Sequence, residues 1–463
     1  MPPEITTRAA VSPARQNAVI AALAFAGMGS SFLQTLLIPL QSHLPRLLDS
    51  TPSSTAWVIT ITLLVSAVMT PIAGKLGDMY GKRRVACTLL GAMVIGSIVC
   101  ALSTGLGGLV IGRGLQGMGS GVIPLGIALL RDVLSREKLG GAISLVSATL
   151  GVGGAIGLPI SAYVTEHYEW HLLFWITTCS GLLALALLLW VVPKDQPGTG
   201  GSVDVIGALG LAVALAGLLL GVSQGNSWGW TSPAILTCFG VGIVAFVLWV
   251  LYELRIANPI VDLRVTVLPP VLMTNLASVA MGFALFSSSI AFPQLLQLPT
   301  EIGGFGVPLF YAALMLMPSG VAMLIVSPMA GKAQAKWGPR PLLVAGALIL
   351  TVAYGLCFAL QLKPWEISLM NLLLGIGVGL GYAAMPALVM RAVPLTQTAS
   401  ANGVNTLMRA FGTTVAAAVV GAILAGADHS DMLGAFRIVF LLGIFASATC
   451  AVLAFLIPVR KDA

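Results

Sequence analysis

Two arginines stand inside long apolar runs of this sequence, where they are the side chains most able to do chemistry. Arg113 lies within the run 107–129, and Arg409 lies near the start of the run 402–426. All 16 acidic residues, by contrast, lie in the termini, in polar breaks or at the ends of runs. The sequence has no HExxH pattern, no CxxC pair and no GxxxxGK[ST] phosphate loop. These absences argue against a membrane-embedded enzyme, a zinc site and an ATP-driven pump.

The apolar runs are the elements that must position these groups. Hydrophobic residues make up 57% of the 463 residues and charged residues 8%, whereas a soluble domain carries about 25% charged residues. Each run approaches the roughly 20 residues that a helix needs to cross a bilayer, and a helix satisfies its own backbone polar groups in lipid. The sequence therefore predicts an all-α integral membrane protein. Its fourteen transmembrane helices are expected at 17–41, 55–74, 86–104, 107–129, 140–164, 172–192, 204–223, 233–252, 271–293, 308–330, 341–361, 367–389, 402–426 and 434–457.

The placement of lysine and arginine predicts how the chain is oriented. Basic residues gather in the breaks that follow even-numbered runs and in both termini, including Arg8, Arg460 and Lys461. The opposite breaks contain Arg46 and Lys363. By the positive-inside rule, both termini are expected in the cytoplasm of a multi-pass protein of the plasma (inner) membrane. The net charge of +7 is thus a topology signal, and no nucleic-acid partner is expected.

An internal repeat predicts two related halves. The segment 70–75 (TPIAGK), followed by Gly81 and Arg83, recurs as 327–332 (SPMAGK), followed by Gly338 and Arg340. Both copies end a span, the second and the tenth, and repeated halves that rock about a midplane site are a common transporter plan. We expect a six-helix half at 1–192, a linker with two extra central helices at 193–265, and a second six-helix half at 266–463.

The break between the second and third spans reads Gly74-Lys75-Leu76-Gly77-Asp78-Met79-Tyr80-Gly81-Lys82-Arg83-Arg84. It resembles, position by position, the signature loop of the major facilitator superfamily, and the fourteen-span layout resembles the drug:proton antiporter branch of that family. The glycines permit a tight turn and close helix approach, and Asp78 can pair with cations or a helix N-terminus. The resemblance implies a major facilitator fold whose loop latches one conformation. The residues it implicates are Gly74, Asp78, Gly81, Arg83 and Arg84.

Two further spans carry family-like motifs. The stretch around Arg113 resembles the family's second motif, whose arginine is implicated in proton coupling; the alternative is that the side chain snorkels to the membrane surface. The segment 151–162 resembles the motif that marks antiporters, with Gly153, Gly157 and Pro159 shaping the helix. Leu158 splits the usual Gly-Pro pair there, and generic packing of small residues is the alternative.

The first span has Gln34 at the position where the family resemblance implies an aspartate. Gln34 cannot titrate, so either a residue nearer the membrane edge carries the proton or the cycle is not proton-driven. The edge candidates, each with a solvated loop group as the alternative, are Asp78, Asp132, Glu166, Glu301, His43, His167 and His171. Residues that could line a substrate cavity, with interhelical contact as the alternative, are Gln34, Asn275, Tyr311, Tyr382, Asn405 and Arg409.

Two functions remain open from the sequence. The first is a proton-coupled exporter, an antiporter of amphipathic, cationic or neutral, small molecules that works by alternating access. The second is a carrier of a lipid or an endogenous metabolite, not driven by protons because Gln34 replaces the acid. In either case we expect a monomer in the lipid bilayer, with small amphipathic substrates and no metal or cofactor. For the first function, protons are a further partner and the proton gradient is the energy source.

Overall fold

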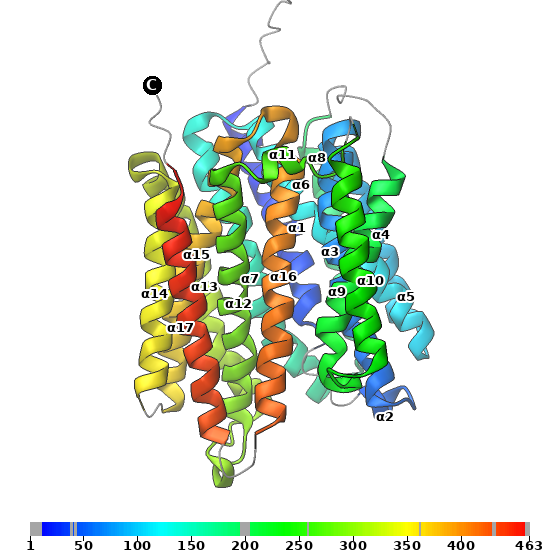
Figure 1. Cartoon of the computed structure of the whole chain (residues 1–463), viewed down its shortest axis with the longest axis vertical. Coiled ribbons are helices and arrows are strands. Elements are labelled where there is room, and N and C mark those ends of the chain that lie inside the picture. The colour runs from blue at the N-terminus through cyan, green and yellow to red at the C-terminus, as the bar shows by residue number, and fades with distance from the viewer. Residues whose placement is uncertain are drawn as a thin grey trace, which may run out of the picture.

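The computed structural model describes residues 12–37, 40, 44–194, 204–256, 259–360, 363–427 and 432–458. Within these ranges the chain forms α-helices and short 3-10 turns and no strand, and the long helices run side by side in one bundle (Figure 1). Thirteen of these helices are long and apolar enough to cross a membrane. The all-α membrane fold predicted from the sequence is therefore confirmed.

The helices follow the predicted order. The first six runs correspond to α1 (Pro13–Thr35), α3 (Pro52–Tyr80), α4 (Lys82–Leu102), α5 (Leu106–Gly117) with α6 (Val122–Val133), α7 (Arg136–His167) and α8 (Leu172–Val191). The central pair is α9 (Val205–Trp228) and α10 (Pro233–Glu253). The last six are α12 (Pro269–Gln297), α13 (Leu309–Trp337), α14 (Pro339–Ala359), α15 (Pro364–Ala392), α16 (Thr398–Ala425) and α17 (Met432–Leu456). Two short helices, α2 (Leu44–Leu47) and α11 (Leu263–Thr266), lie between the longer ones.

The fourth predicted span is broken. A 3-10 turn at Met118–Gly121 separates α5 from α6, and each of these helices has 12 residues, too few to cross alone. A Cβ added at Gly117 would lie 2.7 Å from the Thr62 carbonyl oxygen of α3, and one at Gly121 would lie 2.6 Å from Ala73 Cβ. The glycines therefore let α3 press against the turn. A fourteenth crossing needs α5 and α6 together, so the fourteen-span count stays a prediction.

Buried apolar side chains form separate clusters along the chain. The largest two draw mainly on α1–α8 and on α12–α17. A third joins α3, α9, α10 and α16 through residues such as Ala67, Leu211 and Leu407. At its far end, Asn226 Nδ2 donates to the Ala418 carbonyl oxygen over 3.1 Å, and Gln224 Nε2 donates to Thr60 Oγ1 over 3.4 Å. The central pair thus packs through α9 against both α3 and α16.

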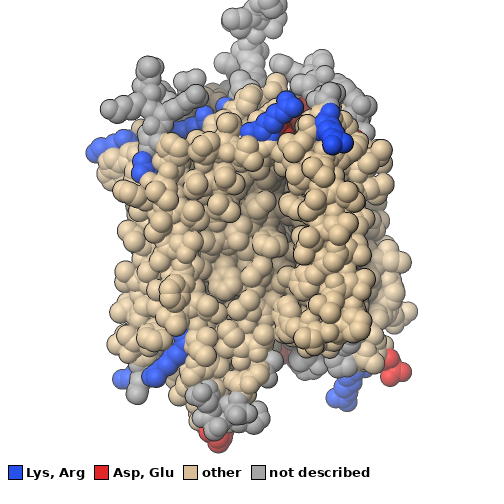
Figure 2. Space-filling model, viewed as in Figure 1, with Lys and Arg blue, Asp and Glu red and all other residues tan. Residues whose placement is uncertain are grey.

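The surface has the charge distribution of a membrane protein. On the face shown in Figure 2, lysine, arginine and acidic residues gather at the two ends, and the broad wall between them is uncharged. Arg8, Arg460, Lys461, His43 and the glycine-rich part of the predicted linker, 195–203, lie outside the described residues. The orientation and the cytoplasmic position of the termini stay predictions.

Candidate functional site

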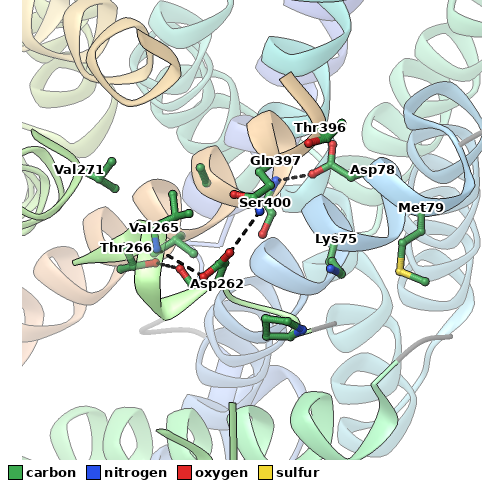
Figure 3. Close-up of a pocket in the computed structure, with 13 residues that line it drawn as sticks. Lys75, Asp78, Met79, Asp262, Val265, Thr266, Val271, Thr396, Gln397 and Ser400 are labelled. Atoms are coloured by element: carbon green, nitrogen blue, oxygen red, sulfur yellow. Dashed lines mark hydrogen bonds between the residues drawn. The ribbon is translucent and has the colours of Figure 1, made fainter. Parts of the chain in front are cut away.

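Asp78 lies in the last turn of α3 and contacts the first turn of α16. The backbone N–H of Ser400 donates to Asp78 Oδ2 over 3.1 Å (Figure 3). Since α16 begins at Thr398, this N–H is one of the first four of the helix, which have no intrahelical acceptor. A carboxylate at a helix N-terminus stabilises it by about 0.3–1 kcal/mol. Asp78 therefore caps a helix more than 300 residues away in sequence.

Gly74, one turn earlier on α3, allows this approach. A Cβ added there would lie 2.5 Å from the Ala399 carbonyl oxygen and 3.0 Å from Ser400 Cα, and backbone atoms cannot yield as a flexible side chain would. We call Gly74, Asp78 and Ser400 the latch, and the end of the bundle that carries them the latch end. At the latch, the Asp78 carboxylate binds α16, and the absence of a side chain at Gly74 lets α3 lie close enough for that bond.

The rest of the signature loop is fastened elsewhere. Gly81, with φ of 105°, ends α3 and begins α4, a backbone conformation that favours glycine. Arg83 donates to the Leu189 carbonyl oxygen of α8 over 2.6 Å, and Arg84 is exposed. The loop therefore holds together helices of the first six and, through Gly74 and Asp78, also reaches α16.

Three more contacts close the latch end between early and late helices. Arg131 of α6 donates to Thr398 Oγ1 over 2.6 Å. On the other side of the bundle, Gln334 of α13 donates to Ser144 Oγ of α7 over 3.3 Å. Gly331 of α13 lies against α7 so closely that an added Cβ would be 2.3 Å from the Gly141 Cα. Helices α3, α6 and α7 thus meet α13 and α16 along both seams at this end.

A cavity of about 140 Å³ lies beside the latch (Figure 3). The segment 259–262, which follows α10, lines part of this cavity and binds the start of α16. Ser400 Oγ donates to the Ile260 carbonyl oxygen over 3.2 Å, and Gln397 Nε2 donates to Asp262 Oδ2 over 3.2 Å. Glu253, the last residue of α10, accepts the backbone N–H groups of Ile260 and Val261 at 3.1 and 3.2 Å. Glu253 therefore shapes the segment that holds Ser400.

Glu253 also belongs to a buried acidic pair that sequence reasoning missed. Asp204 Oδ1, at the start of α9, accepts from the Gly207 N–H over 2.8 Å and from the Tyr252 hydroxyl over 2.9 Å. Asp204 Oδ2 and Glu253 Oε2 are buried and have no hydrogen-bond partner among the described residues. In the sequence, both acids stand at the ends of predicted spans. The sequence positions could have indicated this pair. Two antiparallel helices joined by a short turn place the start of the first, here Asp204, beside the end of the second, here Glu253.

Arg113 is fully enclosed and well bonded. Its side chain is 1% exposed, so it does not snorkel to the surface. Nε donates to the Val58 carbonyl oxygen of α3 over 3.1 Å, and one terminal nitrogen donates to the Leu33 carbonyl oxygen over 3.1 Å and to Gln116 Oε1 over 3.0 Å. Leu33 lies in the last turn of α1, where carbonyls lack intrahelical donors. Arg113 thus caps α1 and joins it to α3.

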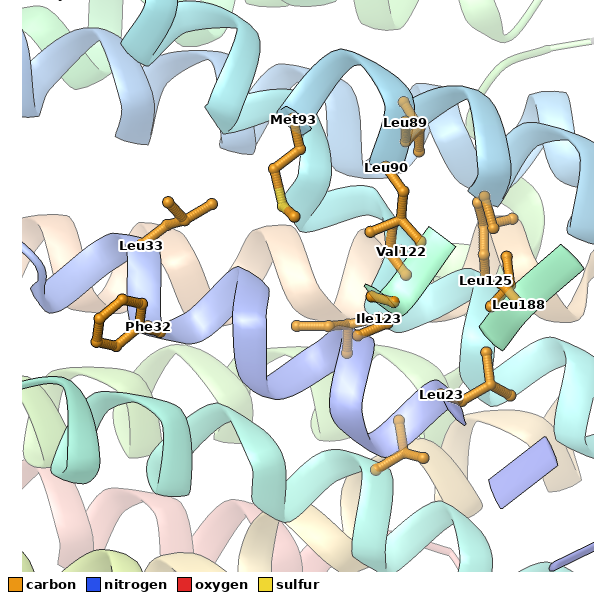
Figure 4. Close-up of a cluster of buried hydrophobic side chains, with 14 of the residues drawn as sticks. Leu23, Phe32, Leu33, Leu89, Leu90, Met93, Val122, Ile123, Leu125 and Leu188 are labelled. Atoms are coloured by element: carbon orange, nitrogen blue, oxygen red, sulfur yellow. The ribbon is translucent and has the colours of Figure 1, made fainter. Parts of the chain in front are cut away.

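The antiporter-like motif packs α7 on α1. A Cβ added at Gly153 would lie 2.4 Å from the Met28 carbonyl oxygen, and a Cβ added at Gly157 would lie 2.4 Å from Thr35 Oγ1. Pro159 lies within α7. Phe32 and Leu33 of the same α1 turn belong to the large apolar cluster shown in Figure 4. These contacts show close packing, and a role in transport direction stays a prediction.

Four of the six predicted cavity residues come together. Asn405 Nδ2 donates to Asn275 Oδ1 over 3.0 Å and to Ser278 Oγ over 2.8 Å, which joins α16 to α12. One turn further along α16, the Arg409 guanidinium lies 4.4 Å from the centre of the Tyr382 ring on α15. All four predicted side chains are at least 95% buried.

The other two predicted cavity residues lie elsewhere. Tyr311 is 60% exposed and lies at the start of α13, far from the latch end, with its ring 5.8 Å from that of Phe310. Gln34 is exposed in the last turn of α1, on the helix face that also carries Gly27 and Ser30. Their place in a cavity stays a prediction. Among the described residues no group of three or more His, Cys, Asp or Glu side chains could hold a metal ion.

Comparisons with known proteins agree with this geometry. The family model described as Major Facilitator Superfamily matches residues 22–417 and 274–463. The lincomycin resistance protein LmrB of Bacillus subtilis is 25% identical over 92% of this chain and 89% of its own length. The multidrug resistance protein Stp of Mycobacterium tuberculosis is 27% identical over 80% of this chain and 68% of its own. The uncharacterized transporter YhcA of Bacillus subtilis is 28% identical over 69% of this chain, which spans 59% of the length of YhcA.

A solved structure has the same fold. The human organic anion transporter MFSD10 (TETRAN) superposes with a TM-score of 0.62, at 14% sequence identity, over 94% of this chain and 100% of that one. The likeness concerns the arrangement of the helices.

Proposed function

Because this chain belongs to the Major Facilitator Superfamily, we propose that it is a secondary active transporter that exports amphipathic small molecules by alternating access. The latch is the observation that carries the proposal, since it is a contact between α3 and α16 that can form or break as a unit. The resistance proteins among its relatives support a drug-like substrate. Two six-helix halves at 1–192 and 266–463, with an insert at 193–265, are part of the proposal.

The closed latch end defines one state of the cycle. Helices α3 and α7 contact α16 and α13 there through backbone-to-backbone approaches at Gly74 and Gly331. With the orientation predicted from the basic residues, this is the state closed to the cytoplasm. Opening to the cytoplasm requires that Ser400 leave Asp78 and that both seams part.

We place proton coupling at the latch end, because Gln34 leaves α1 without an acid. Asp78 and Glu253 both accept backbone N–H groups that define the position of the first turn of α16 or the segment beside it. Asp204 and Lys75 lie close enough to act electrostatically on Glu253, and Glu253 acts in turn on the Tyr252 hydroxyl. Protonation of either carboxylate removes the negative charge that attracts those N–H groups. The hydrogen bonds then weaken, which favours opening of the latch end.

The function is tested in proteoliposomes with a pH gradient imposed across the membrane. An amphipathic dye is added, and both dye movement and internal pH are recorded. Dye movement that speeds up with the gradient, accompanied by proton movement, supports the antiporter. Dye movement that ignores the gradient removes proton coupling and favours the uncoupled carrier, and no dye movement contradicts the export proposal.

Replacing Glu253 by glutamine is expected to flatten the dependence of transport on cytoplasmic pH. Glutamine keeps the shape and an acceptor oxygen, but its hydrogen bonds to the segment 260–261 no longer strengthen with ionisation. A hydrogen bond to a charged group is stronger than one to a neutral group by about 1 kcal/mol. The change in transport rate across the pH series should therefore be about fivefold smaller in the variant than in the wild type. The measurement is the initial transport rate across a pH series. Asp49→Asn, which changes an exposed acid in the turn between α2 and α3, is the control, and equal profiles for the two variants would refute the assignment.

A further inference from the structure

We propose that the exported molecule is an amphipathic anion, and that Arg409, seated on the Tyr382 ring, binds its negatively charged group. The inference rests on the proposed export function and names the substrate class of the α12–α15–α16 cluster. It replaces the expectation of a cationic or neutral substrate.

The contrast between the two arginines inside the bundle is the first argument. Arg113 has three acceptors at 3.0–3.1 Å, two of them backbone carbonyls. Arg409 is as deeply placed, at 5% exposure, yet the one hydrogen bond described for its side chain is a contact of 3.4 Å with Thr406 Oγ1. A guanidinium carries five N–H donors, and burying its charge without acceptors is costly. Arg409 is therefore a buried cation with free donor capacity in the part of the chain described.

The neighbouring helices supply donors and no counter-charge. The described residues of α12 and α16 include no aspartate or glutamate, and those of α15 include Glu366 alone, in its first turn at the end far from the latch. Asn275 is 1% exposed, and its Nδ2 has no acceptor among the described residues. The amide N–H groups of Asn405 both donate within this group, one to Asn275 Oδ1 and one to Ser278 Oγ. An acceptor-rich group such as a carboxylate, sulfonate or phosphate complements this set.

The surroundings of Arg409 fit an amphipathic molecule. The Tyr382 ring lies 4.4 Å from the Arg409 guanidinium and attracts its charge without accepting a conventional hydrogen bond from it. The apolar core of α12–α17 that contains Tyr382 also contains Met281 and Met385, whose flexible thioether side chains can adapt to varied apolar shapes. Arg409 is about three turns, or about 16 Å, from the start of α16, which is close to the middle of a bilayer core of about 30 Å. Transporters built from repeats bind substrate at that depth.

Two dyes on one xanthene skeleton test the sign of the charge. The wild-type protein in proteoliposomes is assayed for movement of carboxyfluorescein, an anion, and of rhodamine 6G, a cation. We expect faster movement of carboxyfluorescein. Arg409→Gln should lower its rate by about 10- to 100-fold, the equivalent of a lost charge-assisted hydrogen bond, without a matching loss for rhodamine 6G. Arg409→Lys keeps the charge and should retain more of the anion rate than Arg409→Gln.

A second variant leaves Arg409 in place. Asn405→Asp puts a carboxylate one turn from the guanidinium on the same helix face, so it should compete with the anion and lower carboxyfluorescein movement. Thermal unfolding in detergent shows which variants are folded. Carboxyfluorescein movement at the wild-type rate in folded Arg409→Gln or Asn405→Asp would overturn the inference. Rhodamine 6G movement without carboxyfluorescein movement in the wild type would overturn it and leave the export function standing, whereas movement of neither dye would contradict both.

Discussion

Replacing Gly74 by alanine is expected to slow transport by at least about fivefold. The new Cβ would lie 2.5 Å from the Ala399 carbonyl oxygen and 3.0 Å from Ser400 Cα, so α3 and α16 must separate and Asp78 loses its place at the helix N-terminus. Overpacking of this kind costs about 1–3 kcal/mol, which shifts an equilibrium between two conformations by about 5- to 150-fold. The state closed at the latch end should become the minor one.

Two measurements check the Gly74 prediction. Transport is assayed in proteoliposomes, and hydrogen exchange of the first turn of α16 reports whether the Ser400 N–H is still held. Gly91→Ala is the matched control, because an added Cβ at Gly91 in α4 meets nothing within 4 Å. We expect faster exchange at Ser400 in Gly74→Ala and wild-type exchange in Gly91→Ala. If both variants exchange and transport alike, the close approach of α3 and α16 is not part of the cycle.

Replacing Arg113 by leucine is expected to destabilise the protein and abolish most transport. The Leu33 carbonyl oxygen and Gln116 Oε1 would lose a charged donor inside the bundle, and each buried acceptor left without a partner costs about 1–3 kcal/mol. The Val58 carbonyl oxygen would lose the same donor but still accepts from Thr62 Oγ1. Relief from burying the guanidinium offsets part of this cost, and we expect a net loss of about 2 kcal/mol or more. The measurement is thermal unfolding in detergent alongside transport in proteoliposomes.

Arg113→Lys separates a structural role from proton coupling. An ammonium keeps the charge, but it has no planar fork with which to reach both carbonyls as the guanidinium does. Intermediate stability with a normal pH dependence would support the role of joining α1 to α3. A variant that is as stable as the wild type but transports without pH dependence would instead favour the coupling role implied by the family resemblance.

The segment that follows the central helix pair reaches the latch. Glu253 at the end of α10 holds the backbone of Ile260 and Val261, and the carbonyl of Ile260 receives the Ser400 hydroxyl. The same Ser400 gives its N–H to Asp78 of α3. Ser400 of α16 is thus bound directly by the Asp78 carboxylate and indirectly, through Ile260, by the Glu253 carboxylate. Any movement of α16 at this end must break or carry both contacts.

The helical membrane fold was readable from the sequence because the solvent imposes it. Hydrocarbon leaves the backbone no partner outside the chain, so long apolar runs such as 204–223 and 434–457 had to become helices. The signature loop likewise identified Gly74 and Asp78 by residue type alone. The break at Met118–Gly121 was not anticipated, since a run of apolar and small residues reads the same whether the helix continues or tightens into a 3-10 turn.

By itself, then, the sequence determined that the chain is a helical membrane protein of a transporter family, and it identified Arg113, Asn275, Tyr382, Asn405 and Arg409 as polar residues within apolar runs. Tertiary structure alone decided what those side chains touch: Asp78 meets a helix N-terminus, Arg113 donates to carbonyls of two other helices, and Arg409 keeps donors free beside Tyr382. The physical reason is that burial in lipid depends on local composition, which a sequence displays. The partner of a polar group depends on contacts between helices that are distant along the chain.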